Sequence, residues 1–274
     1  MTKPVGQATR GFTAPNRLRL VDTFVLVALR EHLRHMRGLF VDLGYGAAPV
    51  TTVESFERFR KVNPAARALG VEIDPERVRV AEPFARDGLT FRRGGFNLPL
   101  MASESVSLVR AFNVLRQYDE AQVAAALTTL SRFMAPGSFL IEGTSDPPGR
   151  HVCFWVWKHP GGQTAGGGFP REPLLERRWL VFGARLHKEF NPRDLQPYLP
   201  KELIHRAEPG GALDAFFGAW QRHWLANGSL GSRARWANSA RQLARSMPGV
   251  DARAGLTSRG LLAVRATVVR LATG

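Results

Sequence analysis

The sequence predicts an α/β fold, namely a doubly wound, mostly parallel sheet with antiparallel C-terminal strands and a helical C-terminal elaboration. Three observations predict it. Short apolar runs alternate with helical patterns from about residue 39 to residue 143, as in a parallel sheet with right-handed crossovers. The first apolar run stops at two glycines, as a buried strand does where it ends in a tight turn. Beyond residue 144 the alternation stops, and aromatic-rich helical stretches follow.

The expected elements follow in order along the chain. Residues 1–14 are expected to form a loose arm, and Pro15 lies in the first turn of a helix whose apolar positions recur every three or four residues up to Met36. Parallel strands are expected at about 39–43, 67–73, 89–93, 106–111 and 138–143. Helices are expected between them at about 50–61, 75–86 and 120–134.

The remainder is expected to complete the sheet and to add helices. The elements expected there are strands at 151–157 and 179–186, a Gly- and Pro-rich loop at 159–173 that contains a run of three glycines, helices over 192–247 and a closing strand at 260–269. The first two of these strands form a predicted hairpin beside the fifth parallel strand. We divide the chain into an arm and helix (1–37), a core (38–144) and a sheet completion with helical elaboration (145–274), all within one domain. With 274 residues, 44% of them hydrophobic, the chain is long enough for this arrangement.

The charge balance is strongly basic. Lys and Arg number 38 against 23 Asp and Glu, which gives a net charge of +15. Such a charge attracts polyanions, so RNA is a candidate partner. Arginine far outnumbers lysine, which is consistent with a GC-rich coding background, but that background does not explain the excess over acidic residues.

Cysteine and hydropathy exclude several classes of protein. Cys153 is the only cysteine, so neither an intrachain disulfide nor a cysteine cluster for a metal can form. His32 and His35 share a helical face without a further ligand nearby, and we predict no metal site. Residues 1–12 lack the apolar segment of a secretion signal, and no later run approaches the roughly 18 apolar residues of a membrane span. We expect a cytoplasmic protein without a membrane partner, and the oligomeric state is not predicted.

The first glycine turn and the second strand together predict a nucleoside site. Asp42 and Gly44 lie at the end of the first apolar run, Gly46 follows, and Glu72 ends the next strand, 72 − 46 = 26 positions later. Backbone at a glycine turn lets a ligand approach closely, and an acid at this distance can accept hydrogen bonds from both ribose hydroxyls. Two nucleoside chemistries compete for this site. Two features argue against a dinucleotide as the ligand. The third position of the turn is Pro49 rather than glycine, and an anion at Asp42 repels a pyrophosphate but suits an ammonium group.

On these residues the chain resembles the class I S-adenosylmethionine-dependent methyltransferases, a Rossmann-like family whose first motif is an acid, any residue, Gly, any residue, Gly. The resemblance covers roughly residues 38 to 144. It implies S-adenosylmethionine as the cofactor, with Asp42 facing its amino end, Glu72 binding the ribose hydroxyls and Ile73 packing on the adenine. Backbone contacts are expected from Gly44, Tyr45 and Gly46. The helix before the first strand often flanks the cofactor in this family, which makes the arm a candidate lid.

The turn after the third strand departs from the family pattern. Relatives place an acid there, whereas this chain has Gly95, Phe96 and Asn97. The amide of Asn97 and the ring of Phe96 could hold the adenine instead, and burial of Phe96 in the core explains the residue equally well. Asn113, at the end of the fourth strand, is expected to converge on the same edge of the sheet.

The end of the fourth strand supplies the candidate catalytic residues. Asn113 and Tyr118 could align an acceptor hydroxyl or amine, and Arg116 could bind an anionic substrate. Helix capping by Asn113 and packing by Tyr118 explain these residues as well. The Asn- or Asp-Pro-Pro-aromatic motif is absent, and Cys153 lacks the Pro-Cys turn of carbon-5 pyrimidine methylation.

The segment 220–245 mixes three tryptophans with five arginines, which could stack on single-stranded RNA or form a helical cap over a small-molecule pocket. The predicted function is transfer of a methyl group from S-adenosylmethionine to an acceptor, a small molecule in preference to RNA. Two alternatives stay open at this point. The first is an RNA-binding protein with an inactive Rossmann-like core, and the second is an NAD-dependent oxidoreductase.

Overall fold

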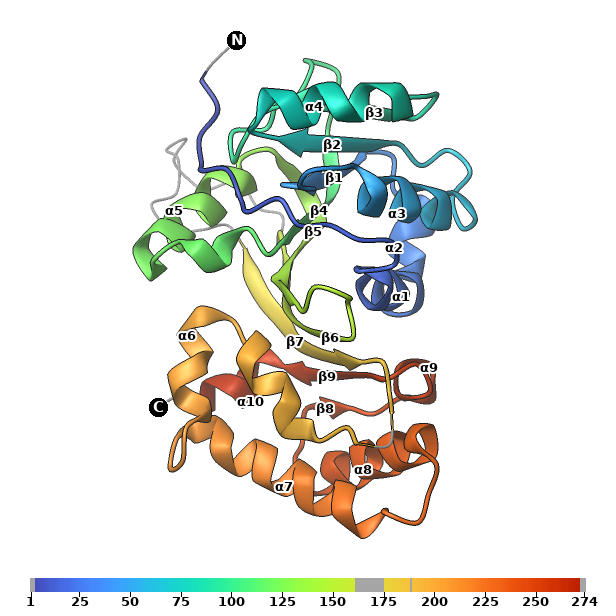
Figure 1. The fold of residues 1–274 in the computed structure, drawn as a ribbon, viewed down its shortest axis with the longest axis vertical. Coiled ribbons are helices and arrows are strands. Elements are labelled where there is room, and N and C mark those ends of the chain that lie inside the picture. Colours follow the sequence, from blue (N-terminus) through green and yellow to red (C-terminus); the bar gives the residue numbers. More distant parts are fainter. Residues whose placement is uncertain (1–2, 161–174, 188, 272–274) are drawn as a thin grey trace. The chain divides into compact units, whose positions relative to one another are not determined.

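The computed structural model describes the chain except residues 1–2, 161–174, 188 and 272–274. Most of the loop expected at 159–173, including its run of three glycines, lies outside the described residues. Within the described residues, nine strands are hydrogen-bonded in the order β3-β2-β1-β4-β5-β6-β7-β9-β8 (Figure 1). At the C-terminal end of the sheet, β9 pairs antiparallel with both β7 and β8, which confirms the mixed α/β fold with antiparallel C-terminal strands.

The parallel part of the sheet positions the candidate site. Its strands are β1 (Leu39–Leu43), β2 (Ala68–Glu72), β3 (Leu89–Arg93) and β4 (Val106–Phe112). β1 pairs in parallel with both β2 and β4, and β2 pairs in parallel with β3. All residues of β1 and β2 are buried, as apolar runs covered on both faces require. The chain progresses outward from β1 in both directions, so β1 and β4 flank the switch point at which open α/β sheets bind ligands.

The helices of this part begin at the residues that their sequences favour. They are α3 (Val50–Arg60), α4 (Pro75–Ala81), the 3-10 turns η1 (Glu82–Phe84) and η2 (Leu115–Gln117), and α5 (Glu120–Ser131). Asp74 caps α4 by accepting a hydrogen bond from the Glu76 N–H (2.9 Å), with proline at the first helical position. Asp119 and Gln122 form a reciprocal capping box at the start of α5.

Several expected elements have different bounds. The first helix is two helices, α1 (Arg19–Ala28) and α2 (Arg30–His35), interrupted at Leu29. The strand expected at 138–143 is longer, β5 (Met134–Ser145), and starts soon after α5 ends. The closing strand was predicted too long: β9 (Leu261–Arg265) leads into α10 (Ala266–Leu271). Ala266 and Val269 are both buried at helical spacing, which favours a helix once pairing with β7 ends at Arg265.

The chain divides into two compact units. The first comprises Met1–Asn16, Arg30–Glu142 and Val156–Glu176, and the second Arg17–Leu29, Gly143–Trp155 and Arg177–Gly274. The remaining elements are β6 (His151–Lys158), β7 (Glu176–Ala184), η3 (Pro192–Tyr198), α6 (Lys201–Ile204), η4 (His205–Ala207), α7 (Ala212–Ala226), α8 (Ser232–Ser246), β8 (Val250–Asp251) and α9 (Ala254–Thr257).

The core of the second unit is built from aromatic side chains of α7 and α8. Trp220, Trp224 and Trp236 are each at most 2% exposed. The rings of Trp220 and Trp236 lie 5.0 Å apart, and Phe190 packs 5.1 Å from Trp224. These three tryptophans stabilise the unit as core residues, and none of them presents a ring face on which an RNA base could stack.

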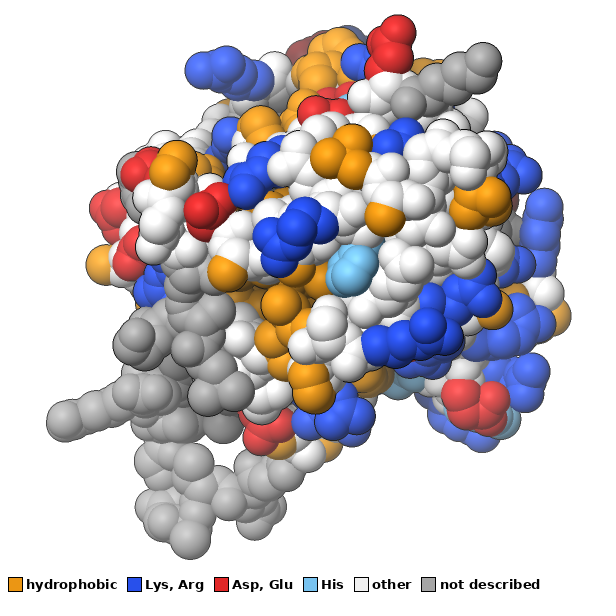
Figure 2. All heavy atoms as spheres, turned by 90° about the horizontal axis from the view of Figure 1, so that it is seen from below, with side chains coloured by type: hydrophobic (Ala, Val, Ile, Leu, Met, Phe, Trp, Pro, Cys, Tyr) orange, Lys and Arg blue, Asp and Glu red, His pale blue; other side chains and the backbone are white. Residues whose placement is uncertain are grey.

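The surface of the folded chain carries the excess of basic side chains that the composition indicates (Figure 2). Figure 2 shows Lys and Arg side chains spread over several parts of the face seen from below, with fewer Asp and Glu side chains. Within the part of the chain that the structure describes, no helix is both long enough and apolar enough to cross a membrane. The described residues also contain no group of three or more His, Cys, Asp and Glu side chains placed to hold a metal ion.

Candidate functional site

The carboxyl ends of β1 to β4 meet at one edge of the first unit, and the turns at this edge form the candidate site. The turn after β1 contains two glycines in the left-handed region, Gly44 with φ of 72° and Gly46 with φ of 91°. Side chains disfavour that region, which explains why glycine is required here. Because neither glycine has a side chain, a ligand or another segment of the chain can lie directly against the backbone.

Glu72 ends β2 and joins the first two turns. Its side chain is 1% exposed, and its carboxylate accepts hydrogen bonds from the backbone N–H groups of Gly46 (3.1 Å) and Ile73 (2.8 Å). Arg77 of α4 forms an ion pair with the same carboxylate at 3.6 Å. The glycine and the acid that lie 26 positions apart in the sequence are therefore in direct contact at the edge of the sheet.

Asp42 lies within β1, and its carboxylate belongs to a buried ion pair. Arg110 of β4, directly opposite in register, donates to one carboxylate oxygen from Nε (2.9 Å) and to the other from Nη2 (2.7 Å). The Thr52 hydroxyl donates to the second oxygen (2.7 Å). The side chains of Asp42 and Arg110 are no more than 3% exposed. The expected contact of Asp42 with an amino group of a cofactor stays a prediction.

Tyr45, between the two glycines, is packed rather than exposed at the turn. Its ring meets Phe91 edge-on at 5.5 Å, and its hydroxyl donates to the Arg77 carbonyl oxygen (3.3 Å). Burial raises the pKa of Tyr45 well above its ordinary value, and the negative charge of Glu72 raises it further. Tyr45 is therefore a neutral phenol at physiological pH, and its backbone remains the part expected to meet a ligand.

The N-terminal arm, residues 3–12, was expected only as a candidate lid, and the structure shows its contacts with the site. It passes close to the tips of β2 and β1 (Figure 1). At the turn after β3, the Phe96 N–H donates to the Val5 carbonyl oxygen (2.8 Å). The Asn97 side chain accepts from the Val5 N–H (2.7 Å) and donates to the Lys3 carbonyl oxygen (2.9 Å). The predicted adenine-binding residues are thus the ones that hold the arm.

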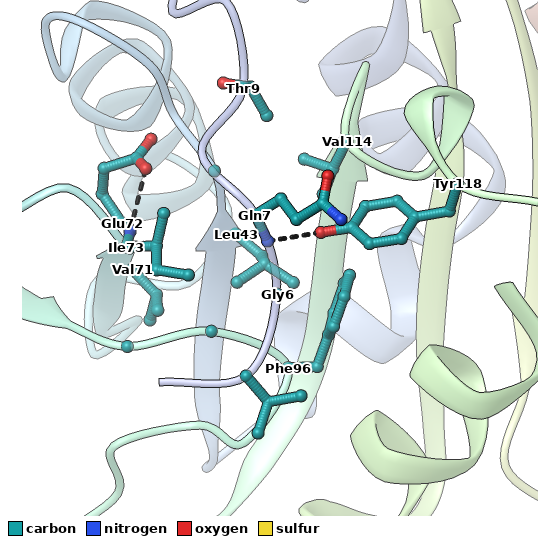
Figure 3. Close-up of a pocket in the computed structure, with 14 residues that line it drawn as sticks. Gly6, Gln7, Thr9, Leu43, Val71, Glu72, Ile73, Phe96, Val114 and Tyr118 are labelled. Carbon is teal, nitrogen blue, oxygen red and sulfur yellow. Dashed lines mark hydrogen bonds between the residues drawn. The ribbon is translucent and has the colours of Figure 1, made fainter. Parts of the chain in front are cut away.

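The arm continues over the glycine turn and α4. Figure 3 shows the Gln7 N–H donating to the Tyr118 hydroxyl, at 2.6 Å. Arg77 donates from Nη2 to the Thr9 carbonyl oxygen (2.9 Å). The Gly11 carbonyl oxygen accepts from the N–H of Ala47 (2.8 Å). The arm is therefore bound at the ends of all four parallel strands.

A small cavity lies between the arm and the strand ends. It has a volume of about 20 Å³ and is lined by the arm, by Leu43 and Gly44 at the end of β1, by Glu72 and Ile73 at the end of β2, and by the turns after β3 and β4. A space of this size holds roughly one water molecule. A nucleoside cannot enter while the arm is in this position.

The three candidate catalytic residues are placed differently. Tyr118 is 5% exposed, lines the cavity, and meets Phe96 edge-on at 5.4 Å. Asn113 is half-buried with φ of 58°, a conformation that Asn adopts more readily than most residues. Arg116 is exposed. Asn113 and Arg116 are not among the residues that line the cavity, and their roles toward an acceptor stay predictions.

Two residues of the site were not predicted, namely Arg77, which pairs with Glu72, and Arg110, which pairs with Asp42. The arm was predicted only as a candidate lid, without its contacts. Arg110 carried a usable signal, because it and Asp42 each interrupt an apolar run, and charges within buried strands are normally paired. The arm carried none, since its contacts with Asn97 and Tyr118 span 92 and 111 positions and it has no periodic pattern.

Comparisons with known proteins give matches to solved structures only. No family model matches the sequence, and no curated protein matches it. An S-adenosylmethionine-dependent methyltransferase from Mesorhizobium loti is 24% identical over 47% of this chain and 56% of its own, with a TM-score of 0.33. Magnesium protoporphyrin IX methyltransferase from Synechocystis, solved with bound S-adenosylmethionine, is 18% identical over 47% of this chain and 59% of its own, with a TM-score of 0.35.

A third match is the plantazolicin methyltransferase BpumL, solved with S-adenosylhomocysteine. It is 12% identical over 48% of this chain and 49% of its own, with a TM-score of 0.38. The matched region spans less than two thirds of each of these three structures. At these TM-scores the matches carry no functional conclusion.

Proposed function

We propose that this chain is an S-adenosylmethionine-dependent methyltransferase whose cofactor lies across the carboxyl ends of β1, β2 and β4. The observation that carries the proposal is the contact between the turn after β1 and the carboxylate that ends β2. Gly46 and Glu72 hold the two turns together beside glycine backbone. A carboxylate at this place accepts hydrogen bonds from ribose hydroxyls. The backbone N–H groups of Gly46, Ile73 and Asp74 use three of its roughly four lone pairs, which leaves about one for a ribose hydroxyl.

The other residues of the edge suit the remaining parts of the cofactor. The Phe96 N–H and the Asn97 amide present a donor and an acceptor to an adenine, and Ile73 offers it an apolar side chain. The backbone of Gly44 and the adjoining turn faces the amino acid end. In our proposal Asp42 contributes negative charge near the amino group, although its carboxylate also neutralises Arg110.

The chemistry that the cofactor supplies when bound is a methyl group on a sulfonium, ready for in-line displacement. The chain then has mainly to position the acceptor. We propose that Asn113 and Tyr118 align its hydroxyl or amine, and that Arg116 binds an anionic group of the acceptor. The position of Tyr118 at the cavity supports its part in this proposal.

For the acceptor we propose a small molecule rather than RNA, selected by residues 145–274. Function in α/β folds varies through segments added to the sheet, and this part of the chain contains the added helices. Burial of Trp220, Trp224 and Trp236 removes the stacking platform that favoured RNA.

Calorimetry with S-adenosylhomocysteine and with NAD tests the proposed function. We expect S-adenosylhomocysteine to bind. Glu72→Gln should weaken it by about 1–3 kcal/mol, because ribose hydroxyls then lose a charged acceptor. Glu76→Gln, which alters an exposed carboxylate on α4, is the matched control. NAD binding without any response to S-adenosylhomocysteine would make the chain a dinucleotide-binding protein instead.

A further inference from the structure

One residue of the arm presents a hydrogen-bond donor and an acceptor to the turn after β3. The Val5 N–H donates to Asn97 Oδ1, and the Val5 carbonyl oxygen accepts from the Phe96 N–H. An adenine carries the same pair on its pairing edge, where the N6 amino group donates and N1 accepts. The backbone of Val5 therefore satisfies the two groups that we assign to adenine recognition.

The turn after β3 lets the arm approach its backbone closely at Val5. A Cβ built on Gly95 would lie 2.0 Å from the Val5 carbonyl oxygen, so any side chain at position 95 would push the arm away. The contact is also held on its other side, since Asn97 donates to the Lys3 carbonyl oxygen. The arm is thus bound through backbone groups of two residues, as an extended ligand would be.

The arm also covers the ribose end of the proposed site. Arg77, which pairs with Glu72 at 3.6 Å, donates to the Thr9 carbonyl oxygen at 2.9 Å. A Cβ on Gly46 would lie 2.7 Å from the Gly11 carbonyl oxygen, so the arm rests on the bare backbone of the glycine turn. Only about 20 Å³ remains between the arm and the strand ends, too little for a nucleoside.

We propose that the N-terminal arm competes with the cofactor for the same site within one chain. The Val5 peptide group then occupies the place of the adenine edge, and the nucleoside binds only to molecules in which the arm has left the site. This inference rests on the proposed function. Val5 is 49% exposed, so the docked arm buries little apolar surface and can be displaced. Because only arm-free molecules bind ligand, the docked fraction lowers the apparent affinity in proportion.

The first experiment releases the arm in the full chain by the substitution Gly6→Val. Gly6 has φ of 133°, which L-residues rarely adopt, and a Cβ there would lie 3.3 Å from the Tyr118 hydroxyl oxygen. Val5→Ala, which keeps every backbone group, is the matched control. We expect Gly6→Val to bind S-adenosylhomocysteine about tenfold more tightly than the wild type and than Val5→Ala.

The second experiment follows the arm itself by amide hydrogen exchange in the wild-type chain. The Val5 and Gln7 amides are hydrogen-bonded in the docked arm. Saturating S-adenosylhomocysteine should speed their exchange, and saturating adenosine should do the same, whereas methionine should not. Slower exchange with S-adenosylhomocysteine would show that the arm is a lid that closes over the cofactor. That result would overturn the proposal that the arm competes with it.

The two proposals fail in different ways. If S-adenosylhomocysteine binds neither the wild type nor Gly6→Val, the methyltransferase assignment is overturned, and the competitor with it. If it binds both equally, or if methionine rather than adenosine releases the arm, only the proposal that the arm competes with the cofactor is overturned. Melting temperatures of both variants identify any that fail to fold, and the exchange experiment needs no variant at all.

Discussion

Arg110 neutralises a carboxylate that is shielded from water. Both side chains of the pair with Asp42 are nearly fully buried, so removing one leaves an uncompensated charge in the core. We expect Arg110→Met to lower the free energy of unfolding by about 3–5 kcal/mol, measured by urea denaturation. Arg34→Met, which breaks an exposed pair with Glu31, should cost less than about 1 kcal/mol.

The same pair allows a decisive second measurement. The double variant Asp42→Asn/Arg110→Met removes both charges, and we expect it to recover much of the stability that Arg110→Met loses. Equal instability of the single and the double variant would show that packing around Arg110, rather than charge, determines the effect.

The lowered pKa of His32 predicts that the free energy of unfolding depends on pH. Burial lowers the pKa of His32 below 6.5, the nearby Lys158 lowers it further, and a hydrogen bond to the Ser107 carbonyl oxygen (2.9 Å) opposes this shift. The unfolded chain therefore binds more protons below pH 6.5 than the folded chain does. The contribution of His32 is fully present above pH 6.5 and is lost as the pH falls toward the folded-state pKa.

The measurement is the free energy of unfolding from about pH 7.5 to about pH 5.5, in the wild type and in His32→Gln. The variant should show a smaller loss on acidification. The remaining loss is expected from His151 and His159, whose pKa values burial also lowers. His35→Gln changes an exposed histidine of the same helix and is the control. Equal slopes in wild type and His32→Gln would contradict the assignment.

Single residues differ in how far the sequence predicts them. Gly44, Gly46 and Glu72 were placed correctly at one edge, because strand ends and glycine turns have local signals. Arg110 can pair with Asp42 only because β1 and β4 are neighbours in the sheet, and no local sequence pattern predicts the order of the strands. The arm was predicted as a candidate lid, but its contacts at this edge could not be predicted, since it binds through backbone groups that every residue has.

Among the elements, β1 and β3 have the predicted bounds. β2 is shorter than predicted by one residue at each end, and β4 is longer by one residue at its carboxyl end. Apolar runs closed by turn residues give this accuracy. The errors lie where tertiary pairing sets the end. β9 stops at Arg265, the last residue that pairs with β7, and β5 extends in both directions beyond its apolar segment. Such ends depend on neighbouring strands that local patterns do not describe.

Asp119, the N-cap of helix α5, directly follows Tyr118, and the start of this helix depends on two side chains. Asp119 accepts a hydrogen bond from the Gln122 N–H (2.8 Å), and the Gln122 side chain accepts from the Asp119 N–H (3.0 Å). We expect Asp119→Ala to lower the free energy of unfolding by about 1 kcal/mol, measured by urea denaturation. Glu120→Ala, in the same exposed first turn but outside the capping box, is the matched control, and an equal effect of both would contradict the role of the cap.

For the whole molecule, the net charge of +15 is the property that the proposed small-molecule acceptor leaves unexplained. Lys and Arg side chains are spread over several parts of one face rather than gathered in a single patch (Figure 2). Charge distributed in this way attracts any polyanion without selecting a sequence, because phosphate contacts carry affinity and base contacts carry specificity.

Binding to mixed RNA over a salt series separates this general attraction from a specific partner. We expect association at about 0.05 M salt that falls steeply and is lost near 0.15 M, as for counterion release without base contacts. The double variant Arg233→Gln/Arg241→Gln, at two exposed positions of α8, should lower the low-salt affinity only slightly, because many other cations remain. Retention of binding at about 0.15 M salt, together with its loss in this variant, would place a specific RNA surface on α8 and make RNA the better acceptor.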